Sequence, residues 1–351
     1  MSGSSFGKAF NITTFGESHG KAIGVVIQGC PPGLKVDGDI IQKALDKRKP
    51  GQGISGTKRK EPDHPIILSG TFKGQTTGTP IMILIENKDA KSKSYDSIAS
   101  LFRPGHGDYT YQAKYGIRDY RGGGRASARE TAARVAAGAI AQVVLDQHNI
   151  NIKSYTLELG GILAIHIDDL SEKEKNTLQC PDLEAARKME KRIKEVKKEG
   201  DSLGGIVEII ASNVPPGLGE PVFDKLDADI AKGLMSIGAV KAVEIGAGTL
   251  VSQMTGFENN DQILPDGFQT NHSGGILAGI SNGDNIITRV HIKPIPSILK
   301  TQVTIDENGH STRISTKGRH DICAIPRINK VCEAMMAIVL TDHLLRQKTL
   351  V

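Results

Sequence analysis

The chain has 351 residues, of which 38% are hydrophobic and 24% charged, a balance typical of a globular protein with a sizeable core. The net charge of +5 and the aromatic content of 4% do not favour a nucleic-acid partner, which would need a basic stripe interleaved with aromatic residues. No apolar run is long enough for a membrane span or a signal core, and the cysteines lack CxxC spacing. We therefore expect a cytoplasmic protein without a disulfide framework or a zinc site.

Apolar runs bounded by glycine and proline predict the β-strands. In chain order these lie at 22–28, 65–69, 80–86, 152–166, 204–212, 286–292 and 301–305. Apolar residues at helical spacing predict helices at 39–48, 127–147, 182–199, 224–236 and 329–346. Strands and helices alternate in blocks along the chain, so we expect a mixed α+β architecture.

One stretch near the N-terminus recurs in the second half of the chain. SHGKAIGVVIQGCPPGL, residues 18–34, aligns without a gap on SLGGIVEIIASNVPPGL, residues 202–218. FRPGH followed by a long helix is likewise echoed by FQTNH followed by a second apolar helix. Coincidence is the alternative, but three echoes in one order favour a duplicated unit. We predict one domain over 1–351 with an internal pseudo-repeat, roughly 1–150 and 200–351, and a site at the junction of the halves.

Three glycines stand between arginines in RDYRGGGRASARET, residues 118–131, directly before an alanine-rich helical segment. Glycines let backbone N–H groups approach a ligand, and the N-terminus of a helix is electropositive, so the segment is typical of an anion site. Arg125 and Arg129 are four residues apart, which would place both guanidinium groups on one helical face. The alternative is a solvated loop before a surface helix, but the helix is too apolar to be solvated on all sides.

Three further segments hold ionisable residues in tight turns and are candidates for proton transfer. His19 lies in GESHG, His106 in FRPGHGDYTYQAKYG and Asp321 in GRHDICAIPR. Histidine gives or takes a proton near neutral pH, and loops on a rigid scaffold present such groups. Taken alone, each histidine is as well explained as a hydrogen-bonded loop residue, and Asp321 as a turn or helix cap. The runs GQGISGTK and RGGGRAS lack the spacing of a phosphate loop or of a dinucleotide fingerprint.

Together these motifs resemble the chorismate synthase family along nearly the whole chain. GESHGKAIGVVIQGCPPG, GRASARETAARVAAG and RHDIC match its three signatures in order, and FRPGHGDYTYQAKYG, LGEPVFDKLDADIA and NHSGGILAGIS support the match. The resemblance implies a β-α-β sandwich, a homotetramer and the last step of the shikimate pathway in aromatic amino acid biosynthesis. There, 5-enolpyruvylshikimate 3-phosphate loses phosphate and a C6 hydrogen by anti-1,4-elimination to give chorismate, with reduced FMN required and no net redox change.

The resemblance also implies roles by position. His19 would protonate the leaving phosphate, His106 would protonate or stabilise the reduced flavin, and Asp321 would help the flavin act as a base. The substrate would face the arginines Arg48, Arg129, Arg134 and Arg327. The flavin site would be lined by Arg125, Ala126, Ser127, Gly238, Ala239, Ala278, Lys293, Pro294, Ile295, Pro296, Ser297 and Arg319.

Some features leave parts of this prediction open. Ile54 stands where relatives often have a basic residue, so anion contacts at that loop are in question. The chain lacks an insertion large enough for a flavin reductase, so we expect a separate source of reduced FMN, with use of NADPH by the chain itself left open. Competing hypotheses are a flavin-independent phosphoacid lyase and an RNA-binding module built on the arginine and glycine cluster. Dependence on reduced flavin and a salt-titrated RNA-binding assay distinguish them.

Overall fold

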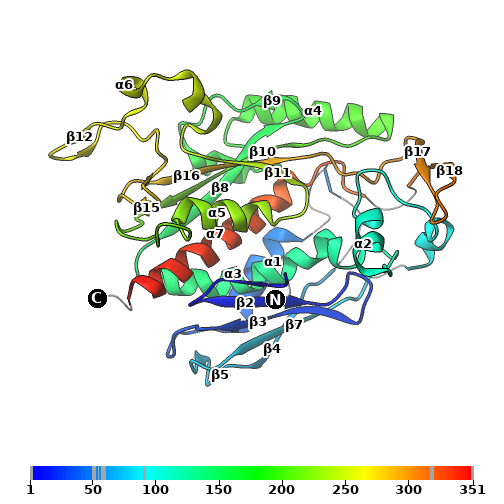
Figure 1. Cartoon of the computed structure of the whole chain (residues 1–351), viewed down its shortest axis with the longest axis horizontal. Helices are drawn as coiled ribbons and strands as arrows, with labels where there is room; N and C mark the ends of the chain where they lie inside the picture. The colour runs from blue at the N-terminus through cyan, green and yellow to red at the C-terminus, as the bar shows by residue number, and fades with distance from the viewer. Residues whose placement is uncertain are drawn as a thin grey trace.

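The computed structural model describes residues 3–49, 53, 55–56, 61–89, 92–316 and 320–348. In this part of the chain, two five-stranded antiparallel sheets enclose a layer of helices, so the molecule is a β-α-β sandwich (Figure 1). The mixed α+β architecture expected from the sequence is confirmed.

The first sheet comes from the N-terminal part of the chain. Its strands lie in the order β1 (Ser5–Phe6), β2 (Asn11–Phe15), β3 (Ala22–Gln28), β7 (Ile81–Glu86) and β4 (Pro65–Ser69). The second sheet has the order β11 (Val240–Ile245), β16 (Ile286–Ile292), β10 (Gly205–Ser212), β8 (Asn151–Leu159) and β9 (Ile162–Leu163). The layer between the sheets holds α1 (Gly38–Arg48), α3 (Thr131–Asp146), α5 (Leu226–Met235) and α7 (Ile325–Gln347).

The core forms where the apolar faces of the sheets meet the helices. In β3, Ile23, Val25 and Ile27 alternate along the strand and are fully buried, as the period of two requires for a strand with one covered face. Helices α3 and α7 approach closely because Gly138 lacks a side chain: a Cβ there would lie 2.4 Å from the Cβ of Ala334. Helices α3 and α7 therefore pack closely at this pair of small residues.

The two sheets have the same topology. In the first half the chain runs β2, β3, α1, β4, β7, α3, and in the second half it runs β8, β10, α5, β11, β16, α7. The matching strands also have matching positions, because β2–β3–β7–β4 in one sheet corresponds to β8–β10–β16–β11 in the other. A duplicated unit, which the sequence echo predicts, would produce such a shared order, and the duplication stays a prediction.

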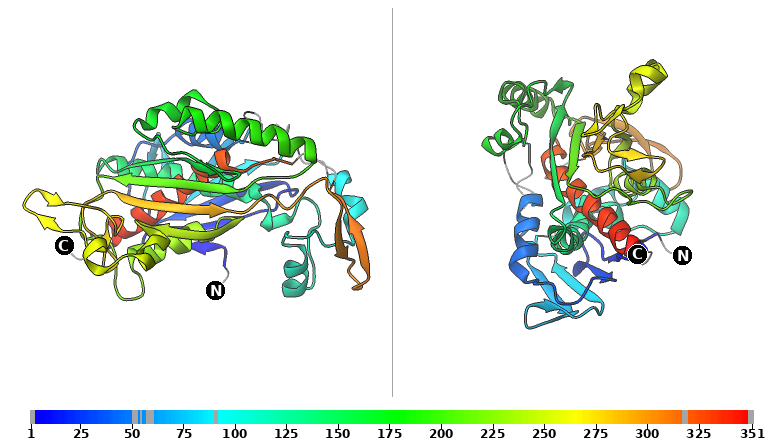
Figure 2. Two further views of the ribbon diagram at one scale, coloured as in Figure 1. Left: turned by 90° about the horizontal axis from the view of Figure 1, so that it is seen from above. Right: turned by 90° about the vertical axis from the view of Figure 1, so that its left-hand side faces the viewer.

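Smaller elements decorate the sandwich. Helix α4 (Leu183–Glu199) lies outside the second sheet beside β9, whereas α2 (Asp108–Tyr115) and the β17–β18 hairpin lie at one end of the molecule and β12 at the other (Figures 1 and 2). The remaining short strands are β5 (Thr71–Phe72), β6 (Gln75–Thr76), β12 (Ile263–Leu264), β13 (Gly267–Phe268), β14 (Ile276–Leu277), β15 (Ile280–Ser281), β17 (Gln302–Ile305) and β18 (Ser311–Ile314). The remaining helical turns are α6 (Gly256–Asn259) and the 3₁₀ turns η1 (Ser92–Ile98), η2 (Gly124–Ala126), η3 (Ala128–Glu130), η4 (Leu170–Lys175) and η5 (Gly248–Gln253).

The predicted elements are largely confirmed, with differences at places where local chemistry interrupts an apolar pattern. The helix expected at 127–147 begins only at Thr131, because Ser127 is extended and caps a separate 3₁₀ turn. The strand expected at 152–166 is a hairpin of β8 and β9, since Gly160 and Gly161 turn the chain with φ of 61° and 82°. Strands β2 and β11 and helix α2 were not predicted, since each is short and of mixed polarity.

All four cysteines are free and buried. Among the described residues, no cluster of histidine, cysteine and carboxylate side chains has the composition of a metal site. The same part of the chain contains no helix with the length and apolar character needed to cross a bilayer.

Candidate active site

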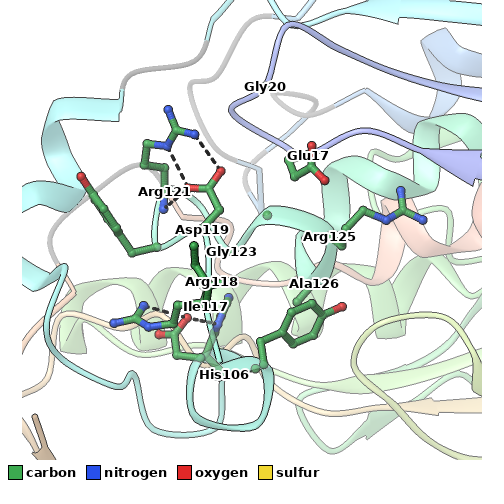
Figure 3. Close-up of a pocket in the computed structure, with 15 residues that line it drawn as sticks. Glu17, Gly20, His106, Ile117, Arg118, Asp119, Arg121, Gly123, Arg125 and Ala126 are labelled. Atoms are coloured by element: carbon green, nitrogen blue, oxygen red, sulfur yellow. Dashed lines mark hydrogen bonds and ion pairs between the residues drawn. The ribbon is translucent and has the colours of Figure 1, made fainter. Parts of the chain in front are cut away.

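A cavity of about 600 Å³ opens beside α2, within the range of pockets that bind small ligands (Figure 3). Helix α2 and three loops form its walls: the turn after β2, the turn before α2 and the arginine- and glycine-rich segment before α3. The lining residues are Glu17, Gly20, His106, Gly107, Asp108, Tyr111, Ile117, Arg118, Asp119, Tyr120, Arg121, Gly123, Gly124, Arg125 and Ala126. The segment that we singled out as an anion site therefore does line a pocket.

The glycine triplet brings the two candidate histidines together. Gly122 and Gly123 have φ of 63° and 94°, a conformation that favours glycine. A Cβ on Gly122 would lie 2.2 Å from Cε1 of His19, and one on Gly123 would lie 2.6 Å from Cε1 of His106. The sequence predicts that these glycines let a ligand approach the backbone. In the structure, two of them also make room for an imidazole ring each.

His106 is held by a buried carboxylate. Its Nδ1 lies 3.0 Å from Oδ1 of Asp108. The two oxygens of the Asp108 carboxylate each accept a 2.7 Å hydrogen bond from the guanidinium group of Arg103. Burial by itself would raise the pKa of Asp108, but the hydrogen bonds and charges of Arg103 and His106 outweigh it and hold the pKa well below its ordinary value. Asp108 is thus an acceptor, so Nδ1 of His106 carries a proton and its Nε2 faces Gly123.

His19 is fixed differently. Its Nδ1 lies 3.1 Å from Oγ of Ser18, and its ring stands edge-on to Tyr95 with the ring centroids 5.3 Å apart. Among the described residues that line the cavity, His106 is present and His19 is not. The two imidazoles therefore reach the glycine triplet from different environments, and His19 is not part of the cavity lining.

Arg48 and Arg129 meet at a buried carboxylate that sequence analysis missed. Asp63 accepts a 2.7 Å hydrogen bond from Arg48 and a second one from Arg129, and all three side chains are at most 3% exposed. Burial lowers the pKa of Arg48 to about 10 despite the opposing charge of Asp63. Nothing in the segment EPDH around Asp63 signals this role, because its partner Arg129 is 66 residues away in the chain.

Arg327 and Asp321 join the same cluster. Arg327 pairs with Asp321, six residues before it, and its Nε donates a 3.3 Å hydrogen bond to the backbone oxygen of Arg48. The neighbouring His320 has a lowered pKa, mainly because of burial and then because of the positive charge of Arg103. Three of the four arginines predicted to face the substrate, together with Asp321, therefore lie in one place.

Arg134, the fourth of these arginines, lies elsewhere. On α3, its Nε donates a 2.9 Å hydrogen bond to Glu130, and its two terminal nitrogens contact the hydroxyl and backbone oxygens of Ser236 at 2.5 and 3.2 Å. These contacts direct the guanidinium group toward the end of α5. The structure does not bring Arg134 to the cluster formed by Arg48, Arg129 and Arg327.

Arg125 and Arg129 do not share a helical face, so that prediction was wrong. They belong to separate 3₁₀ turns, divided by the extended Ser127, and have different hydrogen-bond partners. Arg129 enters the buried cluster with Asp63, whereas Arg125 lines the cavity with Ala126 (Figure 3). The arginine pair thus serves two neighbouring regions.

The remaining residues predicted to line a flavin site fall into two groups. Lys293 donates 2.6 and 2.9 Å hydrogen bonds to the backbone oxygens of Gly105 and Ala239, so Lys293–Ser297 and Gly238–Ala239 lie beside the turn that holds His106. Ala278 lies in the β14–β15 hairpin, at the opposite end of the molecule from α2 (Figure 1). Arg319 and Ile54 lie outside the described residues.

The charge of the cavity wall is more balanced than the count of arginines suggests. Arg121 pairs with Asp119 at 2.8 Å, and Arg118 lies 3.6 Å from Asp108 (Figure 3). No described carboxylate forms an ion pair with Arg125, whose hydrogen-bond acceptors are uncharged oxygens. Arg125 is therefore the lining arginine whose charge is best placed to attract an anionic ligand.

Known proteins with similar sequences and structures give this site a family. The family model described as chorismate synthase matches residues 10–345. A chorismate synthase of Desulfosudis oleivorans is 63% identical over 351 residues, covering all of this chain and 99% of that protein. One of Desulfatibacillum aliphaticivorans is 60% identical over 347 residues, covering 99% of this chain and 97% of that protein. A crystal structure of chorismate synthase superposes with a TM-score of 0.77 at 33% identity, covering 97% of this chain and 93% of that one. The chain belongs to the chorismate synthase family of carbon–oxygen lyases.

Proposed function

We propose that the chain converts 5-enolpyruvylshikimate 3-phosphate to chorismate by anti-1,4-elimination of phosphate and the C6 hydrogen, with reduced FMN and no net redox change. This would be the last step of the shikimate pathway. One observation carries the proposal beyond family membership: the glycine triplet places His19 and His106 against one loop beside the cavity. Such an arrangement would bring two groups for proton transfer to one loop, with His106 in the cavity wall.

The cavity has the size and the polar groups for a flavin. Its volume of about 600 Å³ suits a ligand of that size, and Tyr111 and the backbone of Gly123 and Gly124 offer an apolar face and peptide groups. Arg125, Ala126 and Ser127 would hold the flavin on one side, and Lys293–Ser297 would close the side next to Gly105. The C6 hydrogen of the substrate is not acidic, so a base alone would not start the elimination. When bound, reduced FMN would supply transient electron density that lets the phosphate leave.

The buried arginines would hold the anionic substrate. The substrate carries a phosphate and two carboxylates, and guanidinium groups bind such groups with paired hydrogen bonds. Asp63 would fix the spacing of Arg48 and Arg129 before the ligand arrives. It also balances two positive charges, each of which would cost on the order of several kcal/mol if buried alone. The arginine cluster would therefore be assembled before the substrate binds.

Proton handling would fall to three side chains. His19 would protonate the leaving phosphate, with Ser18 fixing its ring. His106 would present Nε2 to the flavin, since Asp108 holds Nδ1. Asp321 would support removal of the C6 hydrogen, and its ion pair with Arg327 links that role to the substrate cluster.

We also propose that the chain works in the cytoplasm as a homotetramer and receives FMN reduced by a separate enzyme. The exposed side chains of Phe223, Phe257 and Ile263, which are 93%, 83% and 74% accessible, support association with other subunits. Incubation with oxidised FMN, NADPH and substrate but no reductase should give no brisk formation of chorismate. Rapid formation would show instead that the chain reduces FMN itself.

An anaerobic assay tests the central proposal. The protein is mixed with 5-enolpyruvylshikimate 3-phosphate, with and without chemically reduced FMN, and phosphate and chorismate are measured together. We expect equal amounts of both products, and only when reduced FMN is present. Phosphate release without flavin would favour the flavin-independent lyase, and absence of chorismate in every condition would contradict the proposal.

A further inference from the structure

A chain of hydrogen bonds runs from the cavity wall into the helical layer behind Arg125. One terminal nitrogen of Arg125 lies 2.7 Å from Oγ1 of Thr14, and the same Oγ1 lies 3.0 Å from Oε1 of Glu130. A guanidinium group can only donate and a carboxylate can only accept, so the Thr14 hydroxyl must accept from Arg125 and donate to Glu130. The direction of both hydrogen bonds is thus determined by the charges at the two ends.

The carboxylate of Glu130 is itself held in place. Nε of Arg134 donates to its two oxygens at 3.2 and 2.9 Å, and Arg134 is anchored by two contacts with Ser236 at the end of α5. Thr14 is 7% exposed and Glu130 8%, so water competes little for these hydrogen bonds. The chain therefore links β2, η3, α3 and α5 to a single guanidinium group at the cavity.

The other contacts of Arg125 add orientation but no negative charge. Its terminal nitrogens also donate at 3.2 Å to the backbone oxygens of Thr14 and Gly16. These two acceptors lie at the end of β2, so the guanidinium plane is fixed on that edge while its positive charge stays available to a ligand. The Thr14 hydroxyl bridges Arg125 and Glu130 by hydrogen bonds.

We propose that Thr14, Glu130 and Arg134 are positioning residues that hold the guanidinium group of Arg125 toward the flavin. Arg134, which the family resemblance assigns to the substrate, serves here as the outer anchor of Glu130. The inference rests on the proposed function, because it takes the flavin as the ligand of Arg125. It adds that flavin affinity depends on a hydroxyl and a carboxylate that do not line the cavity.

Matched substitutions at two neighbouring threonines test the first link. Thr14→Val removes the hydroxyl and keeps the shape, whereas Thr14→Ser keeps the hydroxyl. Thr13→Val is the control, since Thr13 precedes Thr14 on β2 and its hydroxyl contacts Ser5 at an exposed position. The dissociation constant of FMN is measured by fluorescence titration of each full-length protein, alongside thermal unfolding.

We expect Thr14→Val to raise the dissociation constant of FMN about tenfold, which corresponds to about 1.4 kcal/mol. The dissociation constant of FMN for Thr14→Ser should lie within about twofold of the parent value. The constant for Thr13→Val should equal the parent value, because substitutions at exposed positions away from special contacts have small effects. Glu130→Gln, which keeps the side-chain volume and can present an amide donor to Thr14, should weaken FMN binding in the same direction as Thr14→Val. It provides the same test if Thr14→Val unfolds.

A double-substitution cycle separates positioning from a general structural effect. If Thr14 acts through Arg125, Thr14→Val should add nothing to the weaker FMN binding of Arg125→Ala, because the group that it positions is gone. Equal effects of Thr14→Val with and without Arg125 would overturn the inference, as would parental affinity in both Thr14→Val and Glu130→Gln. A parent protein that does not bind FMN at all would contradict the proposed function itself, so the two failures are distinguishable.

Discussion

Replacing Gly123 by alanine should disable His106 without removing it. The added Cβ would lie 2.6 Å from Cε1 and 2.9 Å from Nε2 of the imidazole, whereas ordinary contacts of this kind are 3.4–4 Å. The ring must therefore move by about 1 Å, which is enough to break the 3.0 Å hydrogen bond between its Nδ1 and Asp108. A displacement of that size at a catalytic group costs about 100-fold in rate.

The backbone contributes a second effect that has to be separated from the first. Gly123 has φ of 94°, and a side chain in left-handed conformations costs about 1–2 kcal/mol. Gly116 provides the control, because it has φ of 73° and an added Cβ there would meet nothing within 4 Å. Gly116→Ala should therefore lower the free energy of unfolding by a similar amount and leave turnover unchanged.

The assay is anaerobic turnover with chemically reduced FMN, measured beside urea unfolding for both alanine variants. We expect Gly123→Ala to lose about 100-fold in kcat relative to Gly116→Ala at comparable stability. In a protein that already carries His106→Ala, Gly123→Ala should cause little further loss. Turnover of Gly123→Ala equal to that of Gly116→Ala would refute the reasoning that this glycine exists to admit the imidazole.

Further predictions concern the histidines and the buried carboxylates. His19→Ala and His106→Ala should keep the fold yet each lose about 100- to 10,000-fold in turnover with reduced FMN, and near-parental rates in both would contradict their roles. Asp63→Asn should lower the free energy of unfolding by about 3–5 kcal/mol, because Arg48 loses the carboxylate that it pairs with and Arg129 keeps only one described carboxylate, that of Glu61 at 4.0 Å; a urea titration that shows less than about 1 kcal/mol would argue against the cluster. The folded-state pKa of Asp108 lies below its unfolded-state value of about 3.9, so its stabilising contribution is present above that pH and is lost as the pH falls through the folded-state pKa. The Tm difference between the parent and Asp108→Asn should therefore narrow from about pH 5 toward about pH 2, and a constant difference would be the contrary result.

The amino-acid sequence by itself determined the elements with long apolar patterns and the family. Helix α4 carries an apolar period of helical spacing, whereas helix α7 and strands β3 and β10 are mainly apolar runs. These features depend only on neighbouring residues, so the existence of the elements follows from local chemistry. The signature motifs placed His19, His106 and Asp321 in tight turns and identified the family, because spacing within a motif is also a local property.

Only the tertiary structure decided which of these groups meet. Asp63 lies 66 residues from Arg129, and Thr14 lies 116 residues from Glu130, so no local pattern could pair them. Arg134 carries the same charge as Arg129 on the same stretch of chain, yet its contact with Ser236 directs it away from the buried cluster. Which arginine faces a ligand depends on the carboxylates and hydroxyls that folding brings beside it, and these come from segments that are distant along the chain.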